Sequence, residues 1–445
     1  MTPTTSPELV QRAFEFGYPL VYNISTVGLF LARGFGGLPP TPFNTYAFAD
    51  ELADPNTDFV SVNNDTLYAI AQLDLSGGAL DVDVPDTGDR YYVLQFVDAW
   101  TNNFAYIGTR ATGNRAGSFR IVPPDSDETD SADRTVIAAP THIVSIVGRI
   151  ACDGPGDIGN VLRLQHGFQI RPVTPNGSLS GIPQPHQDVP AELMFWEQLR
   201  VWSQAFPPAP ADIEYLQQFR ALGLLDEASP YVDPEPALMR ELTEQLAKAK
   251  RDFEAHAMSS STEDLSAWQM NRSLFNYNLD FFEVGTLQAP EWRISDRAEA
   301  YTVRAIAARI GLWGNHAYEA LYPATYVDDS GRPLNGAHRY ELRLRDLPPV
   351  NAFWSLTMYD MPDYYLVRNK LDRYSIGDRT PGLMNEPDGS LIITIQNEEP
   401  DDAKRRANWL PAPAGDFRPM MRLYVPGPEI LGGTYELPPI VKVSP

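Results

Sequence analysis

Apolar residues recur at helical spacing at the start of the chain and in its middle. Over residues 6–34 the pattern predicts a helix with Ser6 as its N-cap, Pro7 in the first helical position and Gly34 at its end. Pro19 lies inside this stretch, and because proline removes a backbone donor we expect it to kink the helix or split it in two. Further apolar stripes with the same period predict several helices in the middle of the chain.

Two regions with the alternating pattern of short β-strands flank the central helices. A short helix at about 157–167 closes the first region, whose strands are expected at about 59–62, 66–75, 80–84, 90–97, 103–109, 118–122, 135–138 and 142–150. In the second region they are expected at Tyr340–Arg345, around Phe353, around Leu391 and at Met421–Val425. Several short strands at near-regular spacing favour a β-sandwich.

The order of these patterns predicts a mainly β chain with a helical middle. Its expected parts are an N-terminal helix and loop over 1–57, a β-sandwich domain over 58–172, a linker and helical segment over 173–323, and a second β-domain over 324–445. The strands expected around 90 and 353 share a layout, since both begin with aromatic residues and end at an Asp. We therefore expect two β-domains of related layout, with Tyr92 and Trp354 in matching core strands.

Composition limits the classes of function. A chain of 445 residues with 43% hydrophobic and 11% aromatic residues is folded and long enough for two or three domains. The formal net charge of −23 argues against nucleic acid as a partner, because phosphate binding needs clustered Lys and Arg. The single cysteine, Cys152, excludes an intramolecular disulfide framework and a cysteine-based zinc site.

The first residues of the chain predict its location. They lack the basic start and apolar core of a signal peptide, so we expect a cytoplasmic protein. The apolar run from Phe14 to Phe35 is interrupted by polar residues such as Glu15, Asn23 and Arg33. A buried amphipathic helix fits this run better than a membrane span, and no membrane partner is expected.

Short motifs along both β-regions resemble those of one protein family. In the first half they are Tyr18–Val21, Asn63–Tyr68, Leu73–Leu75, Asp89–Tyr92 and Trp100–Tyr106. In the second half they are Asn335–Gly336, Leu347–Asp360, Arg373–Arg379, Asp388–Leu391 and Asn408–Pro413. With these motifs the chain resembles a bacterial family that combines the domains of unknown function 1254 and 1214. The resemblance implies an N-terminal immunoglobulin-like sandwich, central helices and a C-terminal jelly-roll sandwich, and it assigns no catalytic residue.

Two aspartates at strand ends are candidates for general acid–base chemistry. Asp98 and Asp360 are each flanked by aromatic residues, and burial there would raise the carboxyl pKa. Alternatively, each carboxylate accepts hydrogen bonds from backbone amides of the next turn. Substrate contacts are expected from nearby aromatic and amide side chains, which are Tyr68, Trp100, Asn103, Trp354 and Tyr364.

Other polar residues suggest an anion or a cation as ligand. Arg373 could hold a carboxylate or phosphate with two parallel hydrogen bonds, or it could pair with an Asp and fix a loop. The turn with Asn63 and Asp65 offers oxygen ligands for a divalent cation or a sugar hydroxyl, or it is an Asx turn that leads into a strand. His316 is expected to cap the last long helix, with a general base as the alternative.

No sequence signature of a nucleotide cofactor fits well. Gly154–Gly159 matches the dinucleotide-binding pattern, but Asp153 and Asp157 would repel a pyrophosphate. We therefore predict an enzyme of general acid–base chemistry, a hydrolase or lyase, that acts on a small organic or carbohydrate-like molecule where the β-domains and helices meet. The alternative is a non-catalytic ligand- or Ca²⁺-binding or assembly protein. A homo-oligomer with a small-molecule ligand is expected in either case.

Overall fold

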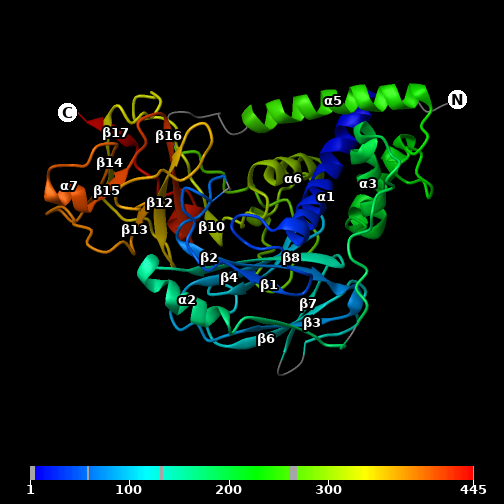
Figure 1. Cartoon of the computed structure of the whole chain (residues 1–445), viewed down its shortest axis with the longest axis horizontal. Helices are drawn as coiled ribbons and strands as arrows, with labels where there is room; N and C mark the ends of the chain where they lie inside the picture. Colours follow the sequence, from blue (N-terminus) through cyan, green and yellow to red (C-terminus); the bar gives the residue numbers. More distant parts are fainter. Residues whose placement is uncertain (1–5, 58–59, 131–133, 176, 260–267, 444–445) are drawn as a thin grey trace.

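Two β-rich parts lie beside each other, and helices cover one face of the first (Figure 1). The computed structural model describes residues 6–57, 60–130, 134–175, 177–259 and 268–443. These residues form four β-sheets, two in each part, and most of the helical residues lie at the start of the chain or between the two parts. The prediction of a mainly β chain with a helical middle is confirmed.

The N-terminal β-part contains two sheets. Its strands are β1 (Tyr46–Phe48), β2 (Thr66–Asp74), β3 (Leu80–Val84), β4 (Tyr92–Asp98), β5 (Asn103–Gly108), β6 (Gly117–Val122), β7 (Thr135–Ala138), β8 (Ile143–Ala151) and β9 (Gln169–Pro172). One sheet has the order β1-β2-β8-β4-β5 and the other β7-β6-β3-β9. Because side chains alternate along a strand, one face of the first sheet packs against the second. Leu94 and Ile146 from the first sheet share this core with Val82 and Ile121 from the second.

The helices are concentrated on the opposite face of the five-stranded sheet (Figure 1). The α-helices of the described residues are α1 (Pro7–Arg33), α2 (Ile158–Gln165), α3 (Met194–Ala205), α4 (Ile213–Gln217), α5 (Pro236–Ser259), α6 (Arg297–Gly311), α7 (Ala403–Ala407) and α8 (Pro428–Leu431). Of these, α1, α3, α4, α5 and α6 contribute to the core on that face. The Ser6 side chain caps α1 by accepting a hydrogen bond from the Leu9 N–H at 3.1 Å. Pro19 lies within α1, which is one continuous helix, so the expected split is wrong.

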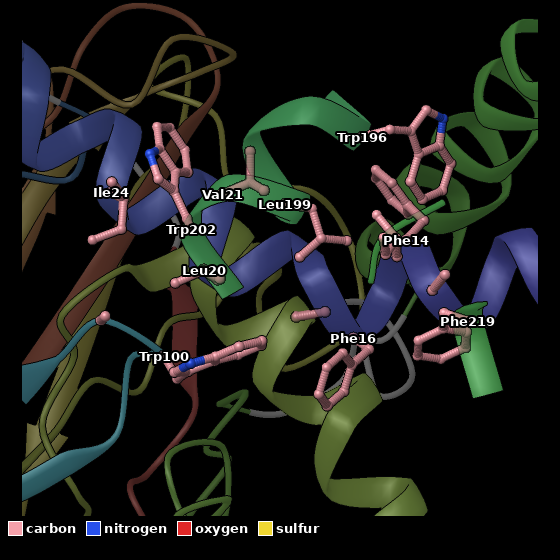
Figure 2. Close-up of a cluster of buried hydrophobic side chains, with 14 of the residues drawn as sticks. Phe14, Phe16, Leu20, Val21, Ile24, Trp100, Trp196, Leu199, Trp202 and Phe219 are labelled. Carbon is pink, nitrogen blue, oxygen red and sulfur yellow. The ribbon is translucent and has the colours of Figure 1, made fainter. Parts of the chain in front are cut away.

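The helical core is built around α1, and it reaches the five-stranded sheet through side chains of that sheet. Figure 2 shows Phe16 of α1 directed toward Trp100, with Leu199 of α3 on the other side of the helix. The ring centroids of Phe16 and Trp100 are 5.1 Å apart. Val147 of β8 belongs to the same core. The N-terminal half therefore has three layers, which are the helices, the five-stranded sheet and the four-stranded sheet.

The C-terminal β-part also contains two sheets. Its strands are β10 (Ala320–Leu321), β11 (Arg339–Leu344), β12 (Trp354–Asp360), β13 (Ser375–Gly377), β14 (Leu391–Gln396), β15 (Trp409–Pro411), β16 (Phe417–Tyr424) and β17 (Ile440–Val443). The orders are β10-β16-β12-β13 and β15-β14-β11-β17. Leu356 and Met421 from the first sheet share a core with Leu342 and Ile393 from the second.

The two β-parts have the same strand connectivity. The run β2-β8-β4-β5 corresponds to β10-β16-β12-β13, and β7-β6-β3-β9 corresponds to β15-β14-β11-β17, with one constant shift in strand number. The directions agree as well, since β6–β7 and β14–β15 are parallel and the other pairs are antiparallel. Tyr92 opens β4 and Trp354 opens the corresponding β12, and both side chains are buried in the cores. The predicted relation between the two β-domains is confirmed.

Some sequence predictions fail or need qualification. The strand expected at 59–62 is wrong, because Val60 and Ser61 lie in a turn, while Phe59 lies outside the described residues. A turn is favoured there because Ser61 has a positive φ of 52°, which a strand does not allow. In the part of the chain that the structure describes, no helix combines the length and apolar character needed to cross a bilayer.

Candidate active site

The same tyrosine–arginine pair occurs once in each β-part. Tyr68 on β2 lies opposite Arg149 on β8. In the C-terminal part Leu321 on β10 lies opposite Leu423, so the same register brings the next residue, Tyr322, opposite Arg422 on β16. The register to the neighbouring strand matches as well, because Arg149 and Arg422 each lie opposite the second residue of the corresponding strands β4 and β12. These four side chains therefore occupy equivalent positions in the duplicated fold.

The two β-parts meet through an aromatic cluster, and we call this contact region the junction. Tyr91, just before β4, contacts Phe353, just before β12, with ring centroids 5.7 Å apart. Tyr424 stacks on Phe353 at 4.1 Å. Arg149 and Tyr322, which come from different β-parts, interact electrostatically, and Tyr322 does so with Tyr68 and Arg422 as well. The junction therefore brings the two equivalent pairs together.

Reciprocal contacts between the two β-parts stabilise the junction on both sides. Arg110 of the N-terminal part forms an ion pair with Glu319, with Nε and Oε2 2.5 Å apart. Arg379 is the equivalent residue of the C-terminal part, since both arginines stand two positions after the glycine that ends β5 or β13. It donates to the backbone oxygen of Asp65, the equivalent of Glu319, at 3.1 Å. Each β-part thus uses an equivalent arginine to contact an equivalent residue of the other part.

Arg149 is buried without an acidic partner. Its guanidinium donates to Gln95 Oε1 at 3.1 Å and to the Trp313 carbonyl oxygen at 3.2 Å, and it lies 5.7 Å from the ring centre of Tyr68. Among the described residues no carboxylate oxygen lies within 4.0 Å of it. The side chain is only 8% exposed, and a buried charge without a partner is costly. Burial alone would lower its pKa, but the surrounding phenols more than offset this, so the guanidinium stays protonated.

Arg422 has a fuller set of partners. It donates to Thr357 Oγ1 at 2.7 Å, to Tyr359 Oη at 2.6 Å and to the Ser61 carbonyl oxygen at 2.9 Å. Burial lowers the pKa of Arg422, and the Tyr359 phenol and the Asp65 carboxylate raise it. The two arginines at equivalent positions therefore differ in the number of hydrogen-bond acceptors that surround them.

The two tyrosines of the pairs retain accessible surface. Tyr68 and Tyr322 are half-buried, whereas Asn315, which donates to Tyr322 Oη at 2.9 Å, is fully buried. Burial raises the pKa of Tyr322, and the nearby Arg149 opposes that rise. Such a phenol can donate a proton to a bound molecule.

Asn63 and Asp65, the predicted cation ligands, lie at the edge of the junction. Asn63 Oδ1 accepts from the N–H groups of Asp65 and Thr66 at 2.7 and 2.9 Å, as in an Asx turn. The Asp65 carboxylate accepts from Tyr424 Oη at 2.8 Å and from the Ser355 hydroxyl. Their oxygens thus already have donors from the chain. In the described ranges, no three His, Cys, Asp or Glu side chains gather as a metal site would need.

Asp98 and Asp360 lie at equivalent strand ends, away from the junction. Asp98 is five residues along β4 from the position opposite Arg149, which is roughly 16 Å at about 3.3 Å per residue. Its carboxylate accepts the Asn102 N–H at 2.8 Å, and burial raises its pKa to about 6. Asp360 accepts the Tyr365 N–H at 2.8 Å. Both carboxylates therefore hold the following turn, the arrangement that the alternative interpretation expects.

The predicted substrate contacts are dispersed. Trp100 lies in the helical core, where its indole N–H donates to the Phe206 carbonyl oxygen, and Trp354 lies in the core of the C-terminal part. Asn103 reaches the junction indirectly, because its Oδ1 accepts from Gln95, which in turn contacts Arg149. Of the predicted contacts, only Tyr68 belongs directly to the paired residues at the junction.

The remaining polar candidates lie within loops of the C-terminal part or have a different role. Arg373 donates to the carbonyl oxygens of Ala407 and Trp409, both at 3.0 Å, and burial lowers its pKa. Tyr364 stacks under the Arg418 guanidinium at 4.3 Å. The expected helix cap at His316 is wrong, because α6 ends at Gly311.

His316 is instead buried among phenols at the junction. Its Nδ1 lies 2.9 Å from Tyr106 Oη and 3.0 Å from Tyr318 Oη. Burial, together with the nearby Arg110, lowers the pKa of His316 to about 3. The imidazole is therefore neutral at physiological pH and cannot supply the positive charge of a binding site.

A surface hollow of about 240 Å³ lies on the C-terminal part, far from these groups. Glu386, Lys404, Glu341 and Arg405 are among the residues that line it. Lys404 pairs with Glu386 at 2.9 Å and Arg405 with Glu341 at 3.1 Å. Because these charges satisfy one another at an exposed surface, the hollow lacks the unpaired groups that mark the junction.

The sequence contained a signal for the arginines that prediction missed. Arg149 is the single charged residue in the apolar run Ile143–Ala151, and Arg422 stands between Met421 and Leu423 in a predicted strand. A charge inside a buried strand is uncommon enough to indicate a special role. Tyr322 carried no comparable signal, because its pairing depends on a strand of two residues.

Comparisons with known proteins find a family model for each β-part. The model for a protein of unknown function (DUF1254) matches residues 43–172, and the model for a protein of unknown function (DUF1214) matches residues 319–428. The crystal structure of the VPA0106 protein from Vibrio parahaemolyticus is similar with a TM-score of 0.74, at 22% identity over 99% of this chain and 100% of that one. A putative uncharacterized protein from Burkholderia cenocepacia has a TM-score of 0.47, at 10% identity over 98% of this chain and 95% of that one. No curated protein matches the chain.

Proposed function

The chain belongs to the family that combines a DUF1254 domain with a DUF1214 domain, and we propose that it is an enzyme of general acid–base chemistry. The reaction is a hydrolysis or a lyase elimination, and the substrate is a small organic or carbohydrate-like molecule. The active site is the junction, where the Tyr68–Arg149 and Tyr322–Arg422 pairs meet. Interfaces between domains are preferred places for such sites.

One observation carries this proposal: Arg149 is buried in the junction without an acidic partner, beside two half-buried phenols. Folding alone does not favour this arrangement, because an unpaired buried charge lowers stability. A buried charge that lowers the stability of the fold is typical of a functional site. The equivalent residue, Arg422, has the partners that Arg149 lacks.

The chemistry follows from the two residue types. The Tyr322 phenol is protonated at neutral pH, and the nearby Arg149 opposes the rise that burial gives its pKa, so it can act as a general acid toward a leaving-group oxygen. Asn315 orients the phenol through its hydrogen bond to Tyr322 Oη. Arg149 positions the substrate and stabilises negative charge that develops on it.

A matched set of tyrosine variants tests the proposal. Wild type, Tyr322→Phe, Tyr68→Phe and Tyr277→Phe are incubated with a panel of small esters, lactones and uronates, and product formation is followed by NMR. Tyr277 is the control, because its phenol also lies beside a buried arginine, Arg304, but in the helical layer. We expect Tyr322→Phe to lose about 100-fold or more in turnover, the usual effect of removing a general acid. Tyr277→Phe should retain the wild-type rate.

Other outcomes would assign a different function. If compounds raise the melting temperature of the wild type but none is converted, the chain is a ligand-binding protein rather than an enzyme. If a converted compound is turned over equally fast by wild type and Tyr322→Phe, the site lies elsewhere. Asp98→Asn and Asp360→Asn then become the next variants to assay, because both aspartates stay candidates.

The finer structural assignments belong to the same proposal. The shared core of each sheet pair supports a two-layered sandwich in both β-parts. The shared connectivity supports one common layout, in which the immunoglobulin-like and jelly-roll designations stay predictions. Self-association into a homo-oligomer, a cytoplasmic location and a bound divalent cation also stay predictions.

A further inference from the structure

We propose that the ligand of the junction is a small monocarboxylate whose carboxylate group binds Arg149. This proposal rests on the location of the active site proposed above and adds the chemical class of the ligand. It follows from the unequal surroundings of two arginines at equivalent positions, from the charge balance around them, and from the kind of hydrogen-bond donors that the junction offers.

Arg149 meets fewer hydrogen-bond acceptors than Arg422 does. A guanidinium carries five N–H groups, and those of Arg149 meet only two acceptors, both neutral, on Gln95 and Trp313. Those of Arg422 meet three acceptors, and the carboxylate of Asp65 lies close by. A carboxylate beside Arg149 would therefore supply the acceptors that its guanidinium lacks, because an Arg–carboxylate contact gives two parallel charge-assisted hydrogen bonds.

The charge balance selects an anion of charge −1. Arg149 and Arg422 supply two positive charges to the paired residues, and Asp65 offsets one of them. The outer cations of the junction, Arg110 and Arg379, already form ion pairs with carboxylates of the chain. The chain as a whole carries −23 and repels anions from its outer surface. The locally positive surroundings of Arg149 are therefore the place where an anion can be held.

The groups around Arg149 favour a carboxylate over a phosphate. Phosphate sites commonly use runs of backbone N–H groups at a helix N-terminus. Here Arg149 is surrounded by phenols, by Gln95 and by a backbone carbonyl, which suits a flat, singly charged group with an apolar or sugar-like body. Tyr68 and Tyr322 keep accessible surface beside this group and can donate hydrogen bonds to the ligand.

Arg304 is a close control for Arg149. It is also buried, it donates to the neutral oxygens of Asn102 and Tyr277, and it lies 5.4 Å from the ring centre of Tyr277. It differs in two respects, because the Asp98 carboxylate is close enough to interact with it electrostatically and because its Nε has no hydrogen-bond partner. Replacing either arginine removes a buried cation stacked on a phenol, but only Arg304 has Asp98 beside it.

The test compares matched ligands on matched variants by isothermal titration calorimetry at low ionic strength. The probes are benzoate and D-glucuronate, their neutral counterparts benzamide and D-glucose, and inorganic phosphate. We expect a carboxylate to bind wild type about tenfold or more tighter than its neutral counterpart, as a charge-assisted pair gives. Arg149→Met should weaken carboxylate binding by a similar factor, and Arg304→Met should leave it unchanged. Arg149→Lys, which keeps the charge, provides a second variant if Arg149→Met does not fold.

Three results would overturn the proposal. These are equal binding of carboxylates and their neutral counterparts, tighter binding of phosphate, and equal losses in the Arg149 and Arg304 variants. Failure of the carboxylate assignment can be distinguished from failure of the proposed function. If neutral molecules bind and are converted, and Tyr322→Phe stops the conversion, the active site stands and only the carboxylate assignment falls. If Tyr322→Phe has no effect either, both proposals fall.

Discussion

Arg149 and Arg304 show that the same residue type can be buried for different reasons. Both stack on a phenol and donate to neutral oxygens, so a contact list alone does not separate them. One difference is the Asp98 carboxylate, which interacts electrostatically with Arg304 and gives that cation a counter-charge within the chain. Under our proposal, the ligand supplies the counter-charge of Arg149.

The Asp98 carboxyl predicts a measurable pH dependence of stability. Burial raises its pKa from 3.8 to about 6, so between these values the folded protein holds a proton that the unfolded chain releases. The free energy of unfolding should therefore fall as pH rises from about 4 to about 6, by about 2–3 kcal/mol from this group. Asp98→Asn should lack this fall, as urea unfolding across that pH range would show. Parallel curves for wild type and variant would contradict the burial effect.

At the scale of helices and strands, much of the fold was predictable from the sequence. The period-2 pattern located β2 to β8, and the Ser6 cap with Gly34 located α1, because these signals are local. The strand expected at 59–62 failed because a turn conformation at Ser61 overrode an apolar run. Local patterns do not report such tertiary effects.

The site was far less predictable, for a physical reason. Arg149 pairs with Tyr68, and Arg422 with Tyr322, through strand registers that only the folded sheets define. A sequence shows that a strand is present but not which of its residues face a partner far along the chain. The sequence favours Asp98 and Asp360 instead, because their aromatic neighbours are adjacent in the chain. Each aspartate lies at the far end of β4 or β12 from the residue that is opposite Arg149 or Arg422.

Equivalent glycines of the two β-parts predict equivalent losses of stability. Gly108 ends β5 and Gly377 ends β13, and a Cβ at either would collide with the backbone oxygen of the first residue of β4 or β12. Gly108→Ala and Gly377→Ala should each lower the free energy of unfolding by about 1–3 kcal/mol, as overpacking does. Gly156→Ala is the control, since a Cβ there meets open space. Urea unfolding of the three variants measures these free energies of unfolding. Equal unfolding curves for all three would contradict the prediction, because the strands would then accommodate the added Cβ without loss of stability.

At the scale of the whole molecule, the duplication explains why the proposed active site lies at the junction. Two copies of one fold meet through equivalent surfaces, so a pair present once in each copy occurs twice at the junction. Reciprocal contacts are what an approximate two-fold relation produces. The copies have diverged at the pair itself, since Arg422 meets three acceptors of its own chain and Arg149 meets two. Under our proposal, this divergence turns a structural repeat into a single binding site.

The same reciprocity predicts that Glu319 links the stability of the two β-parts. Its buried carboxylate accepts from Arg110 at 2.5 Å and from Tyr91 Oη at 2.8 Å, and both donors belong to the other part. Glu319→Gln keeps the shape but leaves Arg110 without its counter-charge, so we expect a loss of about 2–3 kcal/mol in the free energy of unfolding. Glu254→Gln breaks the exposed pair with Arg309 and should change that free energy little. Thermal and urea unfolding of both variants measure the difference. If the Glu319 variant were as stable as the Glu254 variant, the junction would not depend on this ion pair, and the aromatic contact of Tyr91 with Phe353 would be what holds the two parts together.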